Sequence, residues 1–281
     1  MKTSNDIKMI VCYHKDTPRF RSNVLFPVHV GRAGASESLK KLLRDMPGDD
    51  EGDNISAKNG SFCELTALYW AWKNPTPLNG ADYVGLCHYR RLLGLSSKSG
   101  RKAHFWAKME ATLRRGFNLK PKKALLSSRT TREIDDAIRE ACAQYDVVLP
   151  GPLAGDVISV YHYYALWFIE SDLQETLSVV GEKYPAMRGA FETVLRSDRA
   201  YYCNVLLMRS ELWNEYAQWL FDVLFEVERR IGKALPEREP YQRRVYGFLS
   251  ERLLNVWLAY KKEISSKLRV GELPCYFFEG L

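Results

Sequence analysis

The sequence predicts an α/β fold in which helices flank a Rossmann-type mixed, mostly parallel sheet. Short apolar runs without a polar face are typical of strands that are buried on both sides. Amphipathic segments with helical spacing alternate with these runs along the chain, as they do in parallel-sheet proteins. Because 46% of the 281 residues are hydrophobic, the chain can bury a substantial core, and we expect one domain over residues 1–281.

Apolar runs rich in β-prone residues mark the expected strands. Ala81–His88 is apolar on both alternating faces and therefore belongs in the middle of the sheet. Pro27 interrupts a second candidate at Asn23–Val30. The remaining strands are predicted at Ile7–His14, Tyr145–Pro150 and Tyr201–Met208.

Capping signals and apolar stripes mark the expected helices. Ser61 and Glu64 form a capping box that opens a helix ended by Pro75. A second capping box, at Thr130 and Glu133, opens another helix. Residues 92–130 are basic and poorly patterned, so we expect about this stretch to leave the core as an excursion. Further helices are predicted near 160–182, 186–196, 210–231 and 241–262.

Charge and cysteine usage constrain the partners and the compartment. The net charge of +7 favours an anionic partner, such as a pyrophosphate, a nucleic acid or an acidic membrane. The six cysteines are scattered without a C-x-x-C pair and are predicted to be reduced. No signal peptide and no apolar stretch of about 20 residues is evident, so the sequence predicts a cytoplasmic protein.

Two expected strands end in histidine, at His14 and His88. His88 is followed by Arg90 and Arg91, and open α/β sheets bind ligands at the carboxyl ends of their strands. Paired guanidinium groups at that place match the oxygens of a pyrophosphate. The same run also fits a solvated strand exit whose arginines pair with nearby acids, and the pattern does not separate the two interpretations.

The loop before the first capped helix contains Asp53 and Asn54. Their side chains suit contacts with a ribose or a base, although Asp and Asn in loops more often form local turns. The capping box already accounts for Glu64, so the sequence gives that carboxylate no further role.

Glu251 lies on the last predicted helix, on the side opposite the main apolar stripe. That second side is also largely apolar, so the helix is predicted to be buried on both. Burial raises the pKa of a carboxyl group, which suits a general base. The alternative is an ion pair with Arg243, Arg244 or Arg252. Asp198, just before an expected strand, is a second candidate base.

Long stretches of the chain resemble the signature of a bacterial family described as a domain of unknown function. Members of that family occur in capsule, O-antigen and exopolysaccharide gene clusters. The resemblance covers about Ile7 to Tyr260. It is carried by Gly52–Asn59, Cys63–Asn74, Asp82–Arg91, the Asn204 strand with Trp213–Arg230, and Tyr246–Leu254.

This resemblance implies a glycosyltransferase with a GT-A-like fold, similar to galactofuranosyltransferases that use UDP-galactofuranose. The implied reaction inverts the donor carbon and transfers the sugar to a hydroxyl of a lipid-linked or oligosaccharide acceptor. Asn204 becomes a sugar or acceptor contact, Glu251 the first candidate base and Asp198 the second. The implied donor-binding residues are His14, Asp53, Asn54, His88, Arg90 and Arg91.

The sequence names no cofactor and leaves a divalent metal open. Phosphate-binding glycine loops, a nucleophile elbow and zinc spacings are absent. The Asp-x-Asp metal motif common in sugar transferases is also missing, and the run His88–Arg91 occupies its usual place. Positive side chains there would stabilise the departing diphosphate in place of a metal.

Two other classes of function stay open. Seven tryptophans and sixteen tyrosines would suit a carbohydrate- or lipid-surface binding module without turnover, and the basic stretch Arg90–Lys123 would suit a nucleic acid. Buried strands with polar ends favour an enzyme crevice over a binding module. Basic segments in soluble proteins are more often a solvated face or a contact with anionic lipid, so no nucleic-acid partner is expected. A lipid-linked acceptor would add peripheral contact with the inner face of the membrane. The residues expected to make it are Arg101, Lys102, Trp106, Lys108, Arg114 and Arg115.

Overall fold

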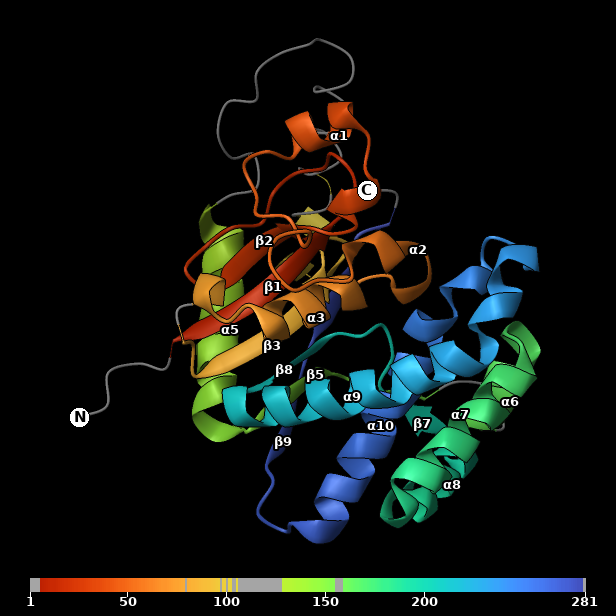
Figure 1. The fold of residues 1–281 in the computed structure, drawn as a ribbon. Coiled ribbons are helices and arrows are strands. Elements are labelled where there is room, and N and C mark those ends of the chain that lie inside the picture. The colour runs from red at the N-terminus through yellow and green to blue at the C-terminus, as the bar shows by residue number, and fades with distance from the viewer. Residues whose placement is uncertain are drawn as a thin grey trace.

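An eight-stranded mixed sheet forms the centre of the computed structural model, which describes residues 6–78, 80–96, 98–99, 101–102, 105, 128–154 and 159–279 (Figure 1). Its main path runs β2-β1-β3-β8-β5-β9, and β4 and β10 extend it beside the end of β3. The strands are β1 (Ile7–Tyr13), β2 (Leu25–His29), β3 (Tyr83–His88), β4 (Arg91–Leu93), β5 (Val147–Pro150), β8 (Leu206–Arg209), β9 (Val270–Leu273) and β10 (Cys275–Phe277). A separate pair joins β6 (Leu153–Ala154) to β7 (Arg199–Ala200).

The strand directions confirm the predicted mixed, mostly parallel sheet. β1 is parallel to β2 and β3, and β5 is parallel to β9, whereas β8 lies antiparallel between β3 and β5. Pro27 is accommodated in β2, at the edge of the sheet, where a missing N–H costs least. The strand predicted from Tyr201 begins only at Leu206, because the preceding residues form a turn. β9 and β10 were not predicted.

Helices cover both faces of this sheet (Figure 1). One core cluster joins the sheet to α3, α7, α8, α9 and α10, and the other joins it to α5. The predicted helix near 210–231 is confirmed as α9. The helices are α1 (Glu37–Leu42), α2 (Asn59–Phe62), α3 (Leu65–Lys73), α5 (Ser128–Gln144), α6 (Val160–Trp167), α7 (Glu170–Lys183), α8 (Arg188–Arg196), α9 (Ser210–Ile231) and α10 (Val245–Ile264).

Alternate residues of the central strands supply the two cores. In β1, Ile10 and Cys12 face the cluster with α9, whereas Met9 and Val11 face the cluster with α5. Full burial of each such side chain contributes roughly 1.5–3 kcal/mol, so this alternation fixes the register of the sheet. A side chain at Gly85 would come within 2.7 Å of the Leu206 carbonyl oxygen, which explains the glycine in β3.

The predicted capping box at Ser61 and Glu64 is wrong. Ser61 lies inside α2 and its hydroxyl donates to the carbonyl oxygen of Lys58. The chain then turns at Cys63, where φ is 54°, before α3 begins. The Glu64 carboxylate makes no capping hydrogen bond and is available for other contacts.

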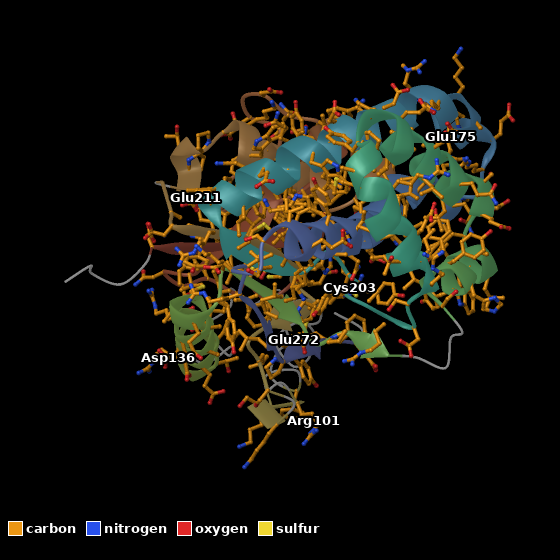
Figure 2. The ribbon with its side chains drawn as sticks, turned by 90° about the horizontal axis from the view of Figure 1, so that it is seen from below. Arg101, Asp136, Glu175, Cys203, Glu211 and Glu272 are labelled. Carbon is orange, nitrogen blue, oxygen red and sulfur yellow. The ribbon has the colours of Figure 1, made fainter. Side chains whose placement is uncertain are left out.

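Most of the predicted basic excursion lies outside the described residues. So do four of the six residues expected at a membrane: Trp106, Lys108, Arg114 and Arg115. The other two, Arg101 and Lys102, are exposed, and Figure 2 shows Arg101 at one end of the molecule. Within the described part of the chain, no helix is both long and apolar enough to cross a bilayer.

Candidate functional site

The carboxyl ends of β1 and β3 bring His14 and His88 together, as their predicted strand ends require. Cys12 pairs with His88 across the two parallel strands, so His14 follows on the same edge of the sheet. His88 Nε2 lies 3.4 Å from His14 Nδ1, and the ring centroids are 5.4 Å apart. His88 is 8% exposed, whereas His14 is open to solvent.

Three arginines add positive charge around this histidine pair. Arg90 and Arg244 act on both imidazoles, and Arg91 acts on His88. Among the described residues, none of these three guanidinium groups forms an ion pair with a carboxylate. Arg244 Nε donates to Cys63 Sγ at 3.2 Å. The interpretation of Arg90 and Arg91 as an acid-paired strand exit is therefore not supported.

The two histidines are held neutral. Burial, together with the effects of His14, Arg90 and Arg91, lowers the pKa of His88 to about 2. Desolvation within the cluster and the charge of Arg90 also lower the pKa of His14. At neutral pH the positive charge of the cluster therefore resides on the arginines, and the imidazoles serve as neutral hydrogen-bonding groups.

The Glu251 carboxylate on α10 is held from two sides. The Cys203 N–H donates to Oε1 at 3.0 Å, and Arg252 Nη1 donates to Oε2 at 2.8 Å. Burial raises the pKa of Glu251, the Arg252 charge opposes that rise, and Glu64 adds to it. The side chain is still 19% exposed. A carboxylate with a raised pKa and an open side suits a proton acceptor.

The predicted ion pair of Glu251 is confirmed with Arg252, so the salt-bridge and general-base interpretations describe the same side chain. The other two candidate partners bond elsewhere: Arg243 donates to the carbonyl oxygens of Pro236 and Arg238, and Arg244 to Cys63. The prediction that α10 is buried on both sides is also confirmed, because nearly all residues from Val245 to Leu258 are buried.

Four aromatic rings enclose the Arg252 guanidinium group. Its carbon Cζ lies 5.0–5.7 Å from the ring centroids of Tyr163, Tyr164, Phe168 and Tyr202. The residue is only 1% exposed, and its Nε and Nη2 find no hydrogen-bond partner in the described structure. Cation–π attraction therefore supports a charge that only one carboxylate neutralises.

One turn before β8 connects the two carboxylates of the site. Cys203 and Asn204 have φ values of 73° and 48°, in the left-handed region that costs a non-glycine residue energy. Asn204 Nδ2 donates to Glu64 Oε1 at 3.0 Å, and Asn204 Oδ1 accepts from the Ser250 hydroxyl at 2.8 Å. The strained turn thus holds Glu64 next to the Glu251 carboxylate.

Sequence reasoning missed three members of this site: Glu64, Arg244 and Arg252 in these roles. Glu64 was assigned to a cap that the helix does not have. The other two were considered only as ion-pair partners of Glu251. The run of arginines just before and within α10 was the signal that could have suggested a cationic wall, because these residues interrupt a helix that is otherwise buried.

Asp53 and Asn54 are occupied by local structure. The Tyr69 hydroxyl donates to Asp53 Oδ1 at 3.1 Å. Asn54 Nδ2 donates to the Gly52 carbonyl oxygen at 2.8 Å, and Asn54 Oδ1 accepts from the Ser56 N–H at 3.1 Å. The turn interpretation is confirmed for Asn54, and no hydrogen bond among the described residues joins either side chain to the histidine and arginine cluster.

Asp198 makes no hydrogen bond or ion pair with the carboxylates of the site in the described part of the chain. It follows α8, is exposed, and forms no ion pair within the part of the chain that the structure describes. Over the same residues, no group of three or more His, Cys, Asp or Glu side chains is placed to hold a metal ion.

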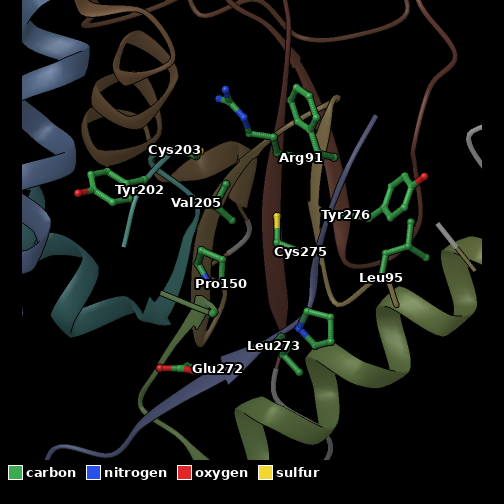
Figure 3. A pocket seen from close by; sticks show the side chains of 13 residues that line it. Arg91, Leu95, Pro150, Tyr202, Cys203, Val205, Glu272, Leu273, Cys275 and Tyr276 are labelled. Atoms are coloured by element: carbon green, nitrogen blue, oxygen red, sulfur yellow. The ribbon is translucent and has the colours of Figure 1, made fainter. Parts of the chain in front are cut away.

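A pocket of about 680 Å³ opens beside the cluster (Figure 3). Arg91 and Cys203 form the wall that it shares with the histidines and Glu251. Tyr202 and Val205 from the segment before β8, together with residues of β4, β5, β9 and β10 and those just after β4, β5 and β9, form the rest, and most of the lining is apolar. In Figure 3, Cys275 lies in the middle of this lining, between Pro150 and Tyr276.

Comparison with known proteins identifies both a family and a fold. A family model described as a domain of unknown function (DUF4422) matches residues 8–262. A solved apo structure of WbbM, described as a bifunctional glycosyltransferase, matches with a TM-score of 0.79 and 28% sequence identity. The match covers 98% of this chain and 46% of that one, so the chain spans less than half of the WbbM structure. A comparison with curated protein sequences gives no match. The predicted GT-A-like fold is confirmed.

Proposed function

We propose that this chain, which belongs to the family described as a domain of unknown function (DUF4422), is a glycosyltransferase that uses a UDP-sugar. The observation that carries the proposal is the cluster of Arg90, Arg91 and Arg244 around the histidines at the carboxyl ends of β1 and β3, in which Arg91 also acts on Glu251. An anion site next to a carboxylate with a raised pKa provides the two groups that sugar transfer from a nucleotide needs. The likeness to WbbM supports the same class of reaction.

Arg90, Arg91 and Arg244 would bind the diphosphate of the donor. Guanidinium groups match phosphate oxygens bidentately and stabilise the charge that develops as the diphosphate leaves. His14 and His88, being neutral, would add hydrogen bonds without increasing the charge. A resident metal is not required by this arrangement, and no Asp-x-Asp pair stands at the end of β3.

Glu251 would act as the base of an inverting transfer. It takes the proton of the acceptor hydroxyl while that oxygen bonds to the anomeric carbon and the bond to the diphosphate breaks. Asp198 is the weaker candidate because it is exposed and no hydrogen bond or ion pair among the described residues joins its side chain to these groups. Asn204 uses both ends of its amide to hold Glu64 and α10, which makes it a positioning residue and not a direct sugar contact.

The family resemblance supports galactofuranose as the sugar and a surface polysaccharide, such as capsule or O-antigen, as the product. A lipid-linked acceptor would bring the enzyme to the inner face of the cytoplasmic membrane, and the exposed Arg101 and Lys102 suit such a contact. Asp53 and Asn54 would at most contact the nucleoside from their loop.

A donor screen tests this function. The purified protein is incubated with UDP and a panel of UDP-sugars, with and without EDTA, and thermal stabilisation and UDP release are measured. We expect UDP and one UDP-sugar to stabilise the protein, with the response lost in Arg90→Ala and kept in Arg188→Ala. Arg188 is the matched control, because its ion pair with Glu192 lies on the exposed surface of α8. Stabilisation by no nucleotide would reject the donor site and favour a binding module without turnover.

A further inference from the structure

A pocket of small-molecule size is lined by Arg91, whose charge acts on His88, and by Cys203, whose N–H binds Glu251. Its volume of about 680 Å³ is within the range of ligand sites, and its walls come from strand ends and not from a helix surface. It opens where β4, β5, β9 and β10 end, next to the turn that holds Glu251. Figure 3 shows the Arg91 guanidinium at one end of the pocket and the Glu272 carboxylate at the other.

The charges of this pocket do not suit a nucleotide diphosphate. Arg91 is its only lining cation among the described residues, and Glu272 contributes a carboxylate. The Arg91 guanidinium also lies 5.5 Å from the Phe277 ring centroid, so one face of this group already contacts an aromatic ring. The cluster at His14 and His88 has three arginines and is therefore the stronger anion site. The pocket has one arginine and one glutamate, so it suits a ligand without net charge better.

The lining chemistry matches a sugar ring. Tyr202, Tyr276 and Phe277 supply aromatic surface for the C–H faces of a ring. Glu272 accepts a hydrogen bond from the Tyr201 hydroxyl at 2.9 Å, and a carboxylate fixed in this way keeps lone pairs for ligand hydroxyls. Apolar walls with a few oriented polar groups are the usual means of binding a neutral polyol specifically.

The position of Glu251 indicates how a ligand in this pocket would present its hydroxyl. Its carboxylate accepts a hydrogen bond from the N–H of Cys203, which lines the pocket, and the charge of Arg91 acts on both Glu251 and His88. The carboxylate is therefore close to both the anion site and the wall of the pocket. In an inverting transfer the acceptor hydroxyl attacks from the side opposite the leaving diphosphate. A hydroxyl presented from the pocket would meet Glu251 on that side.

We infer that this pocket is the acceptor subsite and takes the terminal, uncharged sugar ring of the acceptor glycan. The inference rests on the proposed function. Tyr202 gives the subsite a second role, because its ring lines the pocket and also lies 5.1 Å from Arg252 Cζ, the cationic partner of Glu251. A ligand in the pocket would therefore contact Tyr202, which packs against the ion-pair partner of Glu251.

Cys275→Trp tests the subsite by filling it, and Cys275→Ala is the matched control at the same position. Cys275 is exposed into the pocket, so the larger ring can enter without displacing the core. Acceptor KM is measured with octyl glycosides and free oligosaccharides that end in galactose, glucose or N-acetylglucosamine. We expect Cys275→Trp to raise acceptor KM by about tenfold or more. Donor hydrolysis without acceptor and stabilisation by UDP should be unchanged, and Cys275→Ala should resemble the wild type.

A glycan array read by direct binding, without donor, separates failure of the subsite from failure of the proposed function. Binding by the wild type that is lost in Cys275→Trp supports the subsite even where no UDP-sugar is turned over. An unchanged acceptor KM in a folded Cys275→Trp overturns the inference. Loss of UDP stabilisation instead assigns the pocket to the donor, and binding that depends on the octyl chain alone assigns it to a lipid tail.

Glu272→Gln provides the milder variant if the tryptophan prevents folding. It removes the charge and keeps the shape, and we expect acceptor KM to rise with donor KM constant. Equal changes in both constants, or in neither, would also overturn the acceptor assignment.

Discussion

Glu64 and Glu251 accept hydrogen bonds from two consecutive residues of one turn. The Asn204 amide binds Glu64 at 3.0 Å, and the Cys203 N–H binds Glu251 at 3.0 Å. Two carboxylates from distant parts of the chain are therefore placed by a single strained segment. Burial raises the pKa of Glu251, and the nearby Glu64 charge raises it further.

Glu251→Gln should abolish turnover and leave donor binding intact. The amide keeps the shape and can still accept from the Cys203 N–H, but it cannot take a proton. General-base catalysis contributes roughly 10²–10⁴-fold, so we expect kcat to fall by about that factor. The measurement is UDP release under saturating donor and acceptor. Asp198→Asn is the control and should keep nearly full activity. A larger loss of kcat in Asp198→Asn than in Glu251→Gln would identify Asp198 as the base instead.

Arg252→Met should move the acid limb of the pH–rate profile upward. Glu251 must be ionised to act, so activity falls as pH falls through its raised pKa. Because the Arg252 charge opposes that rise, removing it raises the pKa further. The profile of kcat/KM against pH reports this pKa in the free enzyme. Arg252→Lys retains the charge, so its acid limb should stay at the pH of the wild type. An acid limb that does not move in Arg252→Met would show that Arg252 does not control the pKa of Glu251.

Asn204→Asp should destabilise the fold and slow the reaction. The substitution removes the donor to Glu64 and to the Gly247 carbonyl oxygen and places a third carboxylate beside two others. An unsatisfied buried partner costs about 1–3 kcal/mol. Urea unfolding at pH 7 measures it. Ser250→Ala, which loses the hydroxyl bonds to Asn204 Oδ1 and to the Gly247 carbonyl oxygen but leaves Glu64 its donor, should cost less, and equal costs would contradict a central role for Asn204.

His88 should make the stability of the protein depend on pH below neutrality. Its pKa is lowered to about 2 in the folded chain, against an ordinary value of 6.5. The unfolded chain therefore takes up the proton first, and the stabilisation present above pH 6.5 is lost as the pH falls. From pH 7.5 to 5.5 the loss for one such histidine is about 1.4 kcal/mol.

Urea unfolding of the wild type and of His88→Gln at these two pH values measures that loss. The glutamine does not titrate, so the variant should lose less stability than the wild type over the same interval. Other buried histidines, such as His29, cancel in the comparison. Identical pH dependence in both proteins would show that His88 is not held neutral.

Elements whose residues pattern strongly were predictable from sequence. The apolar stripe of α9 predicts that helix with its bounds. The all-apolar runs predict β1 and β3, with His14 and His88 at or just after their carboxyl ends. β9 and β10 were not predictable, because they are short and half exposed and gain stability only from pairing with β5 and β4.

Contacts of the site depend on tertiary structure that no local pattern encodes. Glu64 has the spacing of a capping box but is turned towards Asn204 by the positive φ of Cys63. The rings around Arg252 come from α6, from the residue that follows it and from the turn before β8. Charged residues such as Arg90 and Glu251 could be predicted as site residues from the sequence, whereas the side chains that contact them could not.

The antiparallel insertion of β8 has a consequence for protein synthesis. β3 and β4 leave the ribosome early, but their neighbours β8 and β10 are translated much later. Until then the edge of β3 and the arginines behind it have no partner strand. Contacts between distant segments form slowly, so the nascent chain exposes an apolar, aggregation-prone edge while the residues between β3 and β8 are translated. The order of the strands therefore leaves β3 dependent on protection by other means until β8 has been synthesised.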